Sequence, residues 1–156
     1  MLNEILPPTV NNTYHGAPIA KLAFAATTVL TLGRSLLHIL TADGGAQSIA
    51  TIPLGTYPPD ASATVVVMFA QWGLSQLLMS LLNMIFLWRY QSLIPLMWLF
   101  VLLEWGGRLV LGMYKPIETR ETPPGVIGNV VFTALAMAMP LSLRRNNIEA
   151  EHTKRC

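Results

Sequence analysis

The chain has 156 residues, of which 53% are hydrophobic and 12% are charged, and its formal net charge at pH 7 is +2. Soluble domains carry about 25% charged residues, so this composition excludes an ordinary soluble domain. The small net charge forms no basic patch, which argues against nucleic acid as a partner. The sequence therefore predicts an all-α, polytopic membrane protein embedded in a lipid bilayer.

Four apolar segments are long enough to cross the hydrocarbon core of a bilayer, which is roughly 30 Å thick, as helices. We expect the spans at about 19–41, 63–88, 93–114 and 126–143. Outer loops are expected at 42–62 and 115–125, and a tail at 144–156. Ser92 is a candidate N-cap for the third span. The whole chain, 1–156, is expected to form a single membrane domain, an antiparallel up-down bundle of four helices.

Basic residues near the ends of the spans predict how the bundle is oriented in the membrane. One side of the expected topology carries Lys21, Arg89, Arg144, Arg145, Lys154 and Arg155. The other side carries Lys115 and Arg120. Both termini are therefore expected in the cytoplasm, with the two loops facing outward. The loop 42–62 has no basic residue and is long for a helix connection, which is typical of a functional lid or a packed cap.

Polar residues recur inside the expected spans. Steps of four and three residues along the first span place five of them on one helix face: Thr27, Thr31, Arg34, His38 and Thr41. In the third span, Glu104 and Arg108 are one turn apart and share a face. The second span carries Gln71, Ser75, Gln76, Ser80 and Asn83, and the fourth carries Asn129 and Thr133.

The depth of these residues predicts a cluster in the outer half of the bundle. A rise of about 1.5 Å per residue brings six of them to similar depths: Arg34, His38, Gln71, Glu104, Arg108 and Asn129. A charge at the bilayer centre costs about 2.5–3.5 kcal/mol on insertion scales, so intramembrane ionisable groups point to function. Two arginines face one glutamate, unless Asp43 or Asp60 folds in from the outer loop. An unpaired cation would attract an anion, a carbonyl-rich ligand or a lipid headgroup.

A structural interpretation stays open beside the functional one. The Glu104–Arg108 pair could simply hold the third helix to the first, and polar residues of the second span commonly form interhelical hydrogen bonds. Phosphate loops, paired metal ligands and nucleophile motifs are missing from the sequence, and Cys156 is the single cysteine. We therefore expect no metal and no cofactor. An enzymatic site, if there is one, would lie within the bundle.

Several stretches resemble small bacterial four-helix membrane proteins of the DoxX-like type. They are GRSLLH (33–38), QWGLSQLLMSLLN (71–83), RYQSLIPLMWLF (89–100), EWGGRL (104–109) and KPIETRETPPG (115–125). This resemblance implies a multi-pass protein of the bacterial inner membrane. DoxX-like relatives include accessory membrane subunits linked to quinone-dependent oxidation.

Three functions are compatible with the predicted cluster. The first is a binding or accessory protein that holds a lipid, a quinone or another amphiphile at Arg34, His38, Glu104 and Arg108. The second is a small proton-coupled transporter, working as a homodimer or in a larger complex, in which Glu104 exchanges a proton. The third is an intramembrane isomerase or cyclase with Glu104 or His38 as acid or base. The sequence favours the first and leaves open whether the protein is an enzyme.

Overall fold

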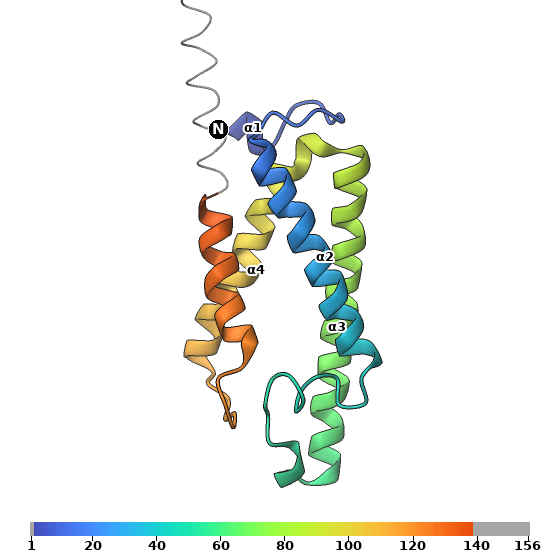
Figure 1. Ribbon diagram of the computed structural model, residues 1–156, viewed down its shortest axis with the longest axis vertical. Coiled ribbons are helices and arrows are strands. Elements are labelled where there is room, and N and C mark those ends of the chain that lie inside the picture. Colours follow the sequence, from blue (N-terminus) through green and yellow to red (C-terminus); the bar gives the residue numbers. More distant parts are fainter. Residues whose placement is uncertain (1, 139–156) are drawn as a thin grey trace, which may run out of the picture.

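The computed structural model describes residues 2–138, and within this range every regular element is a helix (Figure 1). The elements are α1 (Leu2–Ile5), α2 (Pro18–Leu40), η1 (Leu54–Thr56), α3 (Pro59–Arg89), η2 (Gln91–Leu93), α4 (Ile94–Tyr114) and a helix at Pro124–Ala138, here called the 124–138 helix. Successive long helices run in opposite directions, and the 124–138 helix lies beside α4 (Figure 1). The predicted all-helical class is confirmed for these residues.

Three of the helices are long and apolar enough to cross a membrane: α2, α3 with a mean hydropathy of 1.7, and α4 together with η2. Their positions match the first three predicted spans, although α3 begins at Pro59, several residues before the predicted start. The 124–138 helix covers most of the predicted fourth span. The end of that span and the predicted tail at 144–156 lie outside the described residues.

The start of α4 differs from the prediction. Its N-cap position is Leu93, without a side-chain hydrogen bond, so the prediction that Ser92 caps this helix is wrong. The Ser92 hydroxyl instead bonds the N-terminal segment, where it accepts from Asn11 N and donates to Asn11 O, both at 3.0 Å. The Ser92 hydroxyl is thus bonded to the backbone of a segment that is distant in sequence, and it does not cap α4. The same N-terminal segment packs Tyr14 against the core, and burial raises the pKa of Tyr14 to about 12.

The buried face of α3 and much of the buried face of α2 are polar, whereas the exposed face of α3 is largely apolar. The buried residues of α3 are Gly73, Gln76, Ser80 and Asn83, and those of α2 include Thr27, Thr28, Thr31, Ser35 and His38. Leucines, methionines and isoleucines cover the exposed face of α3, among them Leu74, Leu78, Leu81, Leu82 and Ile85. Such a distribution is unfavourable in water and favourable in lipid. It supports a multi-pass membrane protein independently of helix length.

Buried hydroxyl groups in these helices bond the preceding turn of their own helix. Thr28 Oγ1 donates to Phe24 O, Thr31 Oγ1 to Thr27 O, and Ser80 Oγ to Gln76 O, each at 2.8 Å. A hydroxyl that bonds the i−4 carbonyl needs no partner on another helix. The helices can therefore approach each other through small polar residues without leaving unpaired donors.

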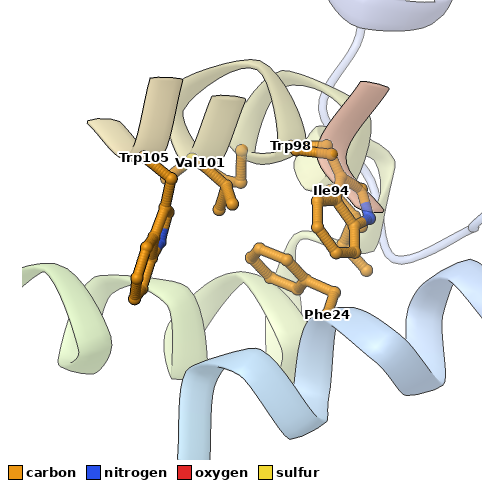
Figure 2. Close-up of a cluster of buried hydrophobic side chains, with 7 residues drawn as sticks. Phe24, Ile94, Trp98, Val101 and Trp105 are labelled. Carbon is orange, nitrogen blue, oxygen red and sulfur yellow. The ribbon is translucent and has the colours of Figure 1, made fainter. Parts of the chain in front are cut away.

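An aromatic core packs between α2, α4 and the 124–138 helix. Figure 2 shows Ile94, Trp98 and Val101 of α4 above Phe24 of α2, with Trp105 one turn further along α4. The rings of Phe24 and Trp98 meet edge to face, with centroids 5.6 Å apart. This core fixes α4 across α2 with apolar side chains.

The closest approach of α2 and α3 is at Gly73. A Cβ atom at this position would lie 2.7 Å from His38 Cβ and 3.0 Å from Ser35 O. Real Cβ atoms do not come so near, so glycine is required where the helices cross. The contact also places His38 against α3 at a defined height.

We expect Gly73→Ala to destabilise the protein by about 1–3 kcal/mol, because the added methyl group overpacks the contact with His38. Gly33→Ala is the matched control, since a Cβ at Gly33 meets nothing within 4 Å and alanine favours a helix by about 1 kcal/mol over glycine. Unfolding in mixed detergent micelles measures both. Equal stability of the two variants would contradict the close packing at Gly73.

Candidate functional site

Two arginines and two tryptophans from three helices form the centre of the site. Arg34 comes from α2, Trp72 from α3, and Trp105 and Arg108 from α4; we call these four residues the arginine–tryptophan cluster. The Arg34 Cζ atom lies 4.8 Å from the Trp72 ring centroid and 5.5 Å from that of Trp105. The Arg108 Cζ atom lies 4.7 and 4.5 Å from the same two rings. Cation–π attraction of about 0.5–2 kcal/mol per contact helps to hold two like charges here.

Arg108 has two further partners. It forms an ion pair with Glu104 one turn earlier on α4, and the exposed fractions of the two side chains are 15% for Arg108 and 36% for Glu104. When the Gln76 amide is oriented to satisfy its neighbours, its oxygen accepts from Arg108 Nη2 at 2.9 Å and from Trp72 Nε1 at 3.1 Å. Gln76 is only 3% exposed, so it is a structural partner of the cluster. Arg108 Nη1 is buried and has no partner among residues 2–138.

Both ring nitrogens of His38 are in use. Arg34 Nε donates to His38 Nε2 at 3.2 Å, and His38 Nδ1 lies 2.7 Å from Gly44 O. Because a guanidinium can only donate, Nε2 must accept, and the ring proton must be on Nδ1, where it donates to the Gly44 carbonyl. His38 is thus neutral and positions Arg34. It has no free nitrogen for the acid or base role that the sequence suggested.

The loop between α2 and α3 is a packed cap. Ala46, Ile52 and Leu54 of the loop are buried against Val65, Val66 and Phe69 on α3. Gly44 and Gly45 have φ values of +60° and +74°, which bend the chain back toward His38. The sequence predicted that this loop is either a functional lid or a packed cap. The structure shows a packed cap, and this cap contacts the site through Gly44.

Asp43 does not pair with Arg34. Its carboxylate accepts hydrogen bonds from the backbone N–H groups of Gly45 at 2.9 Å, Gln47 at 3.1 Å and Ser48 at 2.6 Å. Burial alone would raise the pKa of Asp43, but these bonds and one from the Ser48 hydroxyl lower it to about 2. Asp60 lies in the first turn of α3. The sequence left open whether Asp43 or Asp60 balances the charge of the second arginine. In the structure, neither carboxylate does so.

The loop between α2 and α3 is joined to the loop that follows α4. Arg120 N donates to Thr51 O at 3.0 Å, and Thr51 Oγ1 donates to Glu121 O at 2.9 Å. Thr51 adopts φ +57°, which is rare for a β-branched residue. The pairing connects the cap over His38 to the segment that leads into the 124–138 helix.

The structure divides the six residues that the sequence grouped. Arg34, His38, Glu104 and Arg108 come together as expected. Gln71 lies outside the cluster, with an exposed side chain, and its backbone oxygen accepts from Ser75 Oγ. Asn129 is half-buried on the 124–138 helix; its Oδ1 is buried and has no hydrogen-bond partner among the described residues.

From the sequence, Gln76 was one of several polar residues of the second span and had no role in the site, and Trp72 and Trp105 had none. The available signal for Gln76 was its spacing from Gly73, one turn away, since a glycine often marks the face where two helices meet.

A cavity of about 430 Å³ adjoins the cluster between α3 and α4. Its polar wall consists of Ser75, Gln76 and Glu104, and Arg108 bonds to Glu104 and Gln76 behind this wall. The remaining wall is apolar and includes Met79, Phe100 and Leu103, which are also exposed on the outside of the bundle. The size is within the range of sites for small molecules. The cavity is therefore a hydrocarbon-like space with a polar end.

None of three comparisons, with protein families, with curated proteins and with solved structures, finds a match for the chain. Within residues 2–138, no three histidine, cysteine, aspartate or glutamate side chains gather as metal ligands. The chemistry of the site rests on the arginine–tryptophan cluster, Glu104, Gln76 and the cavity.

We expect Asp43→Asn to loosen the cap over His38, because bonds to a charged acceptor contribute about 1.5–3 kcal/mol each. At neutral pH, hydrogen exchange at the Gly45, Gln47 and Ser48 amides should accelerate more than tenfold in the variant. In the wild type, the Asp43 contribution is present above pH 3.8 and is lost as the pH falls toward 2. Asp60→Asn is the control. Unchanged exchange in Asp43→Asn would contradict the cap.

Proposed function

We propose that the chain is a four-span protein of a bacterial inner membrane, with both termini in the cytoplasm, that binds an amphiphile as a binding or accessory protein. The observation that carries this proposal is the cavity between α3 and α4, which combines an apolar wall with the polar end at Glu104 and Gln76. The ligand would be a lipid, a quinone or another molecule with an apolar chain and a polar head group. The DoxX-like resemblance favours a quinone within this class.

The four-span topology extends what the three long apolar helices support. The 124–138 helix is apolar, lies against α4, and runs opposite to it (Figure 1). Thr133 and Gly128 of this helix face Gly106 and Trp105 of α4. This arrangement favours a fourth crossing. With it, basic residues fall at six positions on the side of the termini, 21, 89, 144, 145, 154 and 155, and at two on the other side, 115 and 120, which favours cytoplasmic termini.

The polar end of the cavity suits a head group that both donates and accepts hydrogen bonds. The Glu104 carboxylate is an acceptor whose charge is already balanced by Arg108. The Gln76 oxygen is occupied by Arg108 and Trp72, which leaves its NH₂ group as a donor. A hydroxyl head between these two groups would donate to Glu104 and accept from Gln76, whereas a carbonyl head would accept from Gln76 only. Its chain would then lie along Met79, Phe100 and Leu103.

The ligand would reach this cavity from the lipid. Met79, Phe100 and Leu103 are exposed on the surface of α3 and α4 that we place against the bilayer. A molecule dissolved in the membrane can therefore slide in sideways without crossing water. The aromatic core around Phe24 and Trp98 packs α2 against α4 (Figure 2).

The alternatives receive less support. A proton-coupled transporter needs Glu104 to release and take up a proton, but the Glu104 carboxylate is engaged in an ion pair with Arg108. An isomerase or cyclase would have to rely on Glu104 alone, because both nitrogens of His38 are in use. Binding requires neither proton transfer nor a second chain.

Native mass spectrometry from mild detergent tests the proposal with a matched pair of variants on α3. We expect a defined extra mass on the wild type and on Gln71→Leu, whose side chain is outside the cavity. The same change at Gln76 removes a donor from the head-group end, so Gln76→Leu should lose about threefold to tenfold in occupancy.

Glu104→Gln is a second variant of the cavity end and should also lose the ligand. Circular dichroism in the same detergent serves as the control that each variant remains helical. A wild type that carries no added mass after incubation with a quinone and with lipid extracts would contradict the proposed function. So would equal occupancy of Gln71→Leu and Gln76→Leu.

A further inference from the structure

The arginine–tryptophan cluster carries one positive charge more than its described partners balance. Arg34 and Arg108 are both guanidinium ions, and the described ion pair is that of Arg108 with Glu104. His38 is neutral, because its Nε2 accepts from Arg34. Asp43, the nearest candidate by sequence, is engaged by the loop amides. Within residues 2–138, no carboxylate forms an ion pair with Arg34.

Arg34 is held with one edge of its guanidinium unused. Its Nε donates to His38, which is anchored in turn by Gly44. Its flat face lies over Trp72 and Trp105. Neither Nη atom has a hydrogen-bond acceptor in the described part of the chain. A guanidinium fixed in this way is preorganised for two parallel hydrogen bonds to an oxyanion.

The space beside this edge is left open by a glycine. A Cβ atom at Gly125, in the first turn of the 124–138 helix, would lie 3.7 Å from Arg34 Nη2. This distance is an ordinary contact, so a side chain at position 125 would enter the space next to the Nη atoms without a clash. Arg34 is half-buried and does not line the α3–α4 cavity. The free edge therefore belongs to a separate location on the loop side of the cluster.

We propose that Arg34 binds an oxyanion, a carboxylate or a phosphate group, at its free Nη edge beside Gly125. The anion neutralises the excess charge of the cluster, and the positive charge of Arg108, which contacts the same two tryptophans, adds to the attraction. The group can belong to the headgroup of an outer-leaflet lipid or to a small anion from the outer aqueous phase. This site goes beyond the amphiphile cavity and does not depend on it.

Substitution of Gly125 tests the site without altering the cluster. Gly125→Asp places an internal carboxylate within reach of Arg34 and should displace the anion, whereas Gly125→Asn has the same size without the charge. Aspartate is also favourable in the first turn of a helix, so the fold is retained. Arg34→Gln is a second variant, which removes the binding edge.

Tryptophan fluorescence reports binding, since Trp72 and Trp105 lie against Arg34. One arm titrates inorganic phosphate into protein in dodecyl maltoside, an uncharged detergent. The other compares nanodiscs of phosphatidylcholine with nanodiscs that also contain phosphatidylglycerol. We expect a spectral change in the wild type and in Gly125→Asn. Gly125→Asp and Arg34→Gln should bind about tenfold more weakly or not at all.

The two arms distinguish the sources of the anion. A response to phosphate in detergent supports a small soluble anion, and a response to phosphatidylglycerol alone supports a lipid headgroup. Either result supports an oxyanion site at Arg34 when Gly125→Asp suppresses it. The proposal is overturned if the wild type responds to neither anion, or if Gly125→Asp and Gly125→Asn respond alike. Loss of amphiphile binding in Gln76→Leu would leave these results unaffected, so the two proposals fail separately.

Discussion

The rest of the structure depends on one constraint: the polar side chains of the helices must meet one another, because the surrounding medium offers them no partner. Gln76, Ser80 and Asn83 are buried on α3, while leucines cover its exposed face. In lipid, apolar packing gives no preference for any one helix face, so small and polar residues determine which faces meet. Gly73 permits the close crossing of α2 and α3, and that crossing places Trp72 of α3 against His38 and Arg34 of α2.

The arginine–tryptophan cluster is a consequence of this packing. Two guanidinium ions are tolerated together because Glu104 balances one charge, the rings of Trp72 and Trp105 face both, and Gln76 and His38 take individual N–H groups. Glu104 and Gln76 also line a largely apolar cavity. His38 bonds only the Nε atom of Arg34, so the Nη edge of Arg34 has no partner among residues 2–138. Both proposed binding sites are therefore places where the cluster has remaining hydrogen-bonding capacity.

Much of this arrangement could be predicted from the sequence, and the failures have physical reasons. Regular spacing identified the stripe of Arg34 and His38 and the Glu104–Arg108 pair, because both depend only on helix periodicity. Gln71 was placed in the site instead of Gln76, and the two lie about 140° apart on a helix. The polar residues of α3 spread around half of its surface, so helical periodicity alone could not identify the buried face. The close contact of Gly73 with His38 identifies it. The roles of Trp72 and Ser92 were missed because they depend on partners far along the chain.

Oxygen accessibility of spin labels along α3 would test most directly whether the polar face is inside and the apolar face meets lipid. Single cysteines from 74 to 85, in a Cys156→Ser background in lipid bilayers, would each carry one label. Accessibility should oscillate with a helical period, with maxima at Leu74, Leu78, Leu81, Leu82 and Ile85 and minima at Gln76, Ser80 and Asn83. Maxima at the three polar positions, or high water accessibility without a period, would contradict the inside-out arrangement and the cluster built on it.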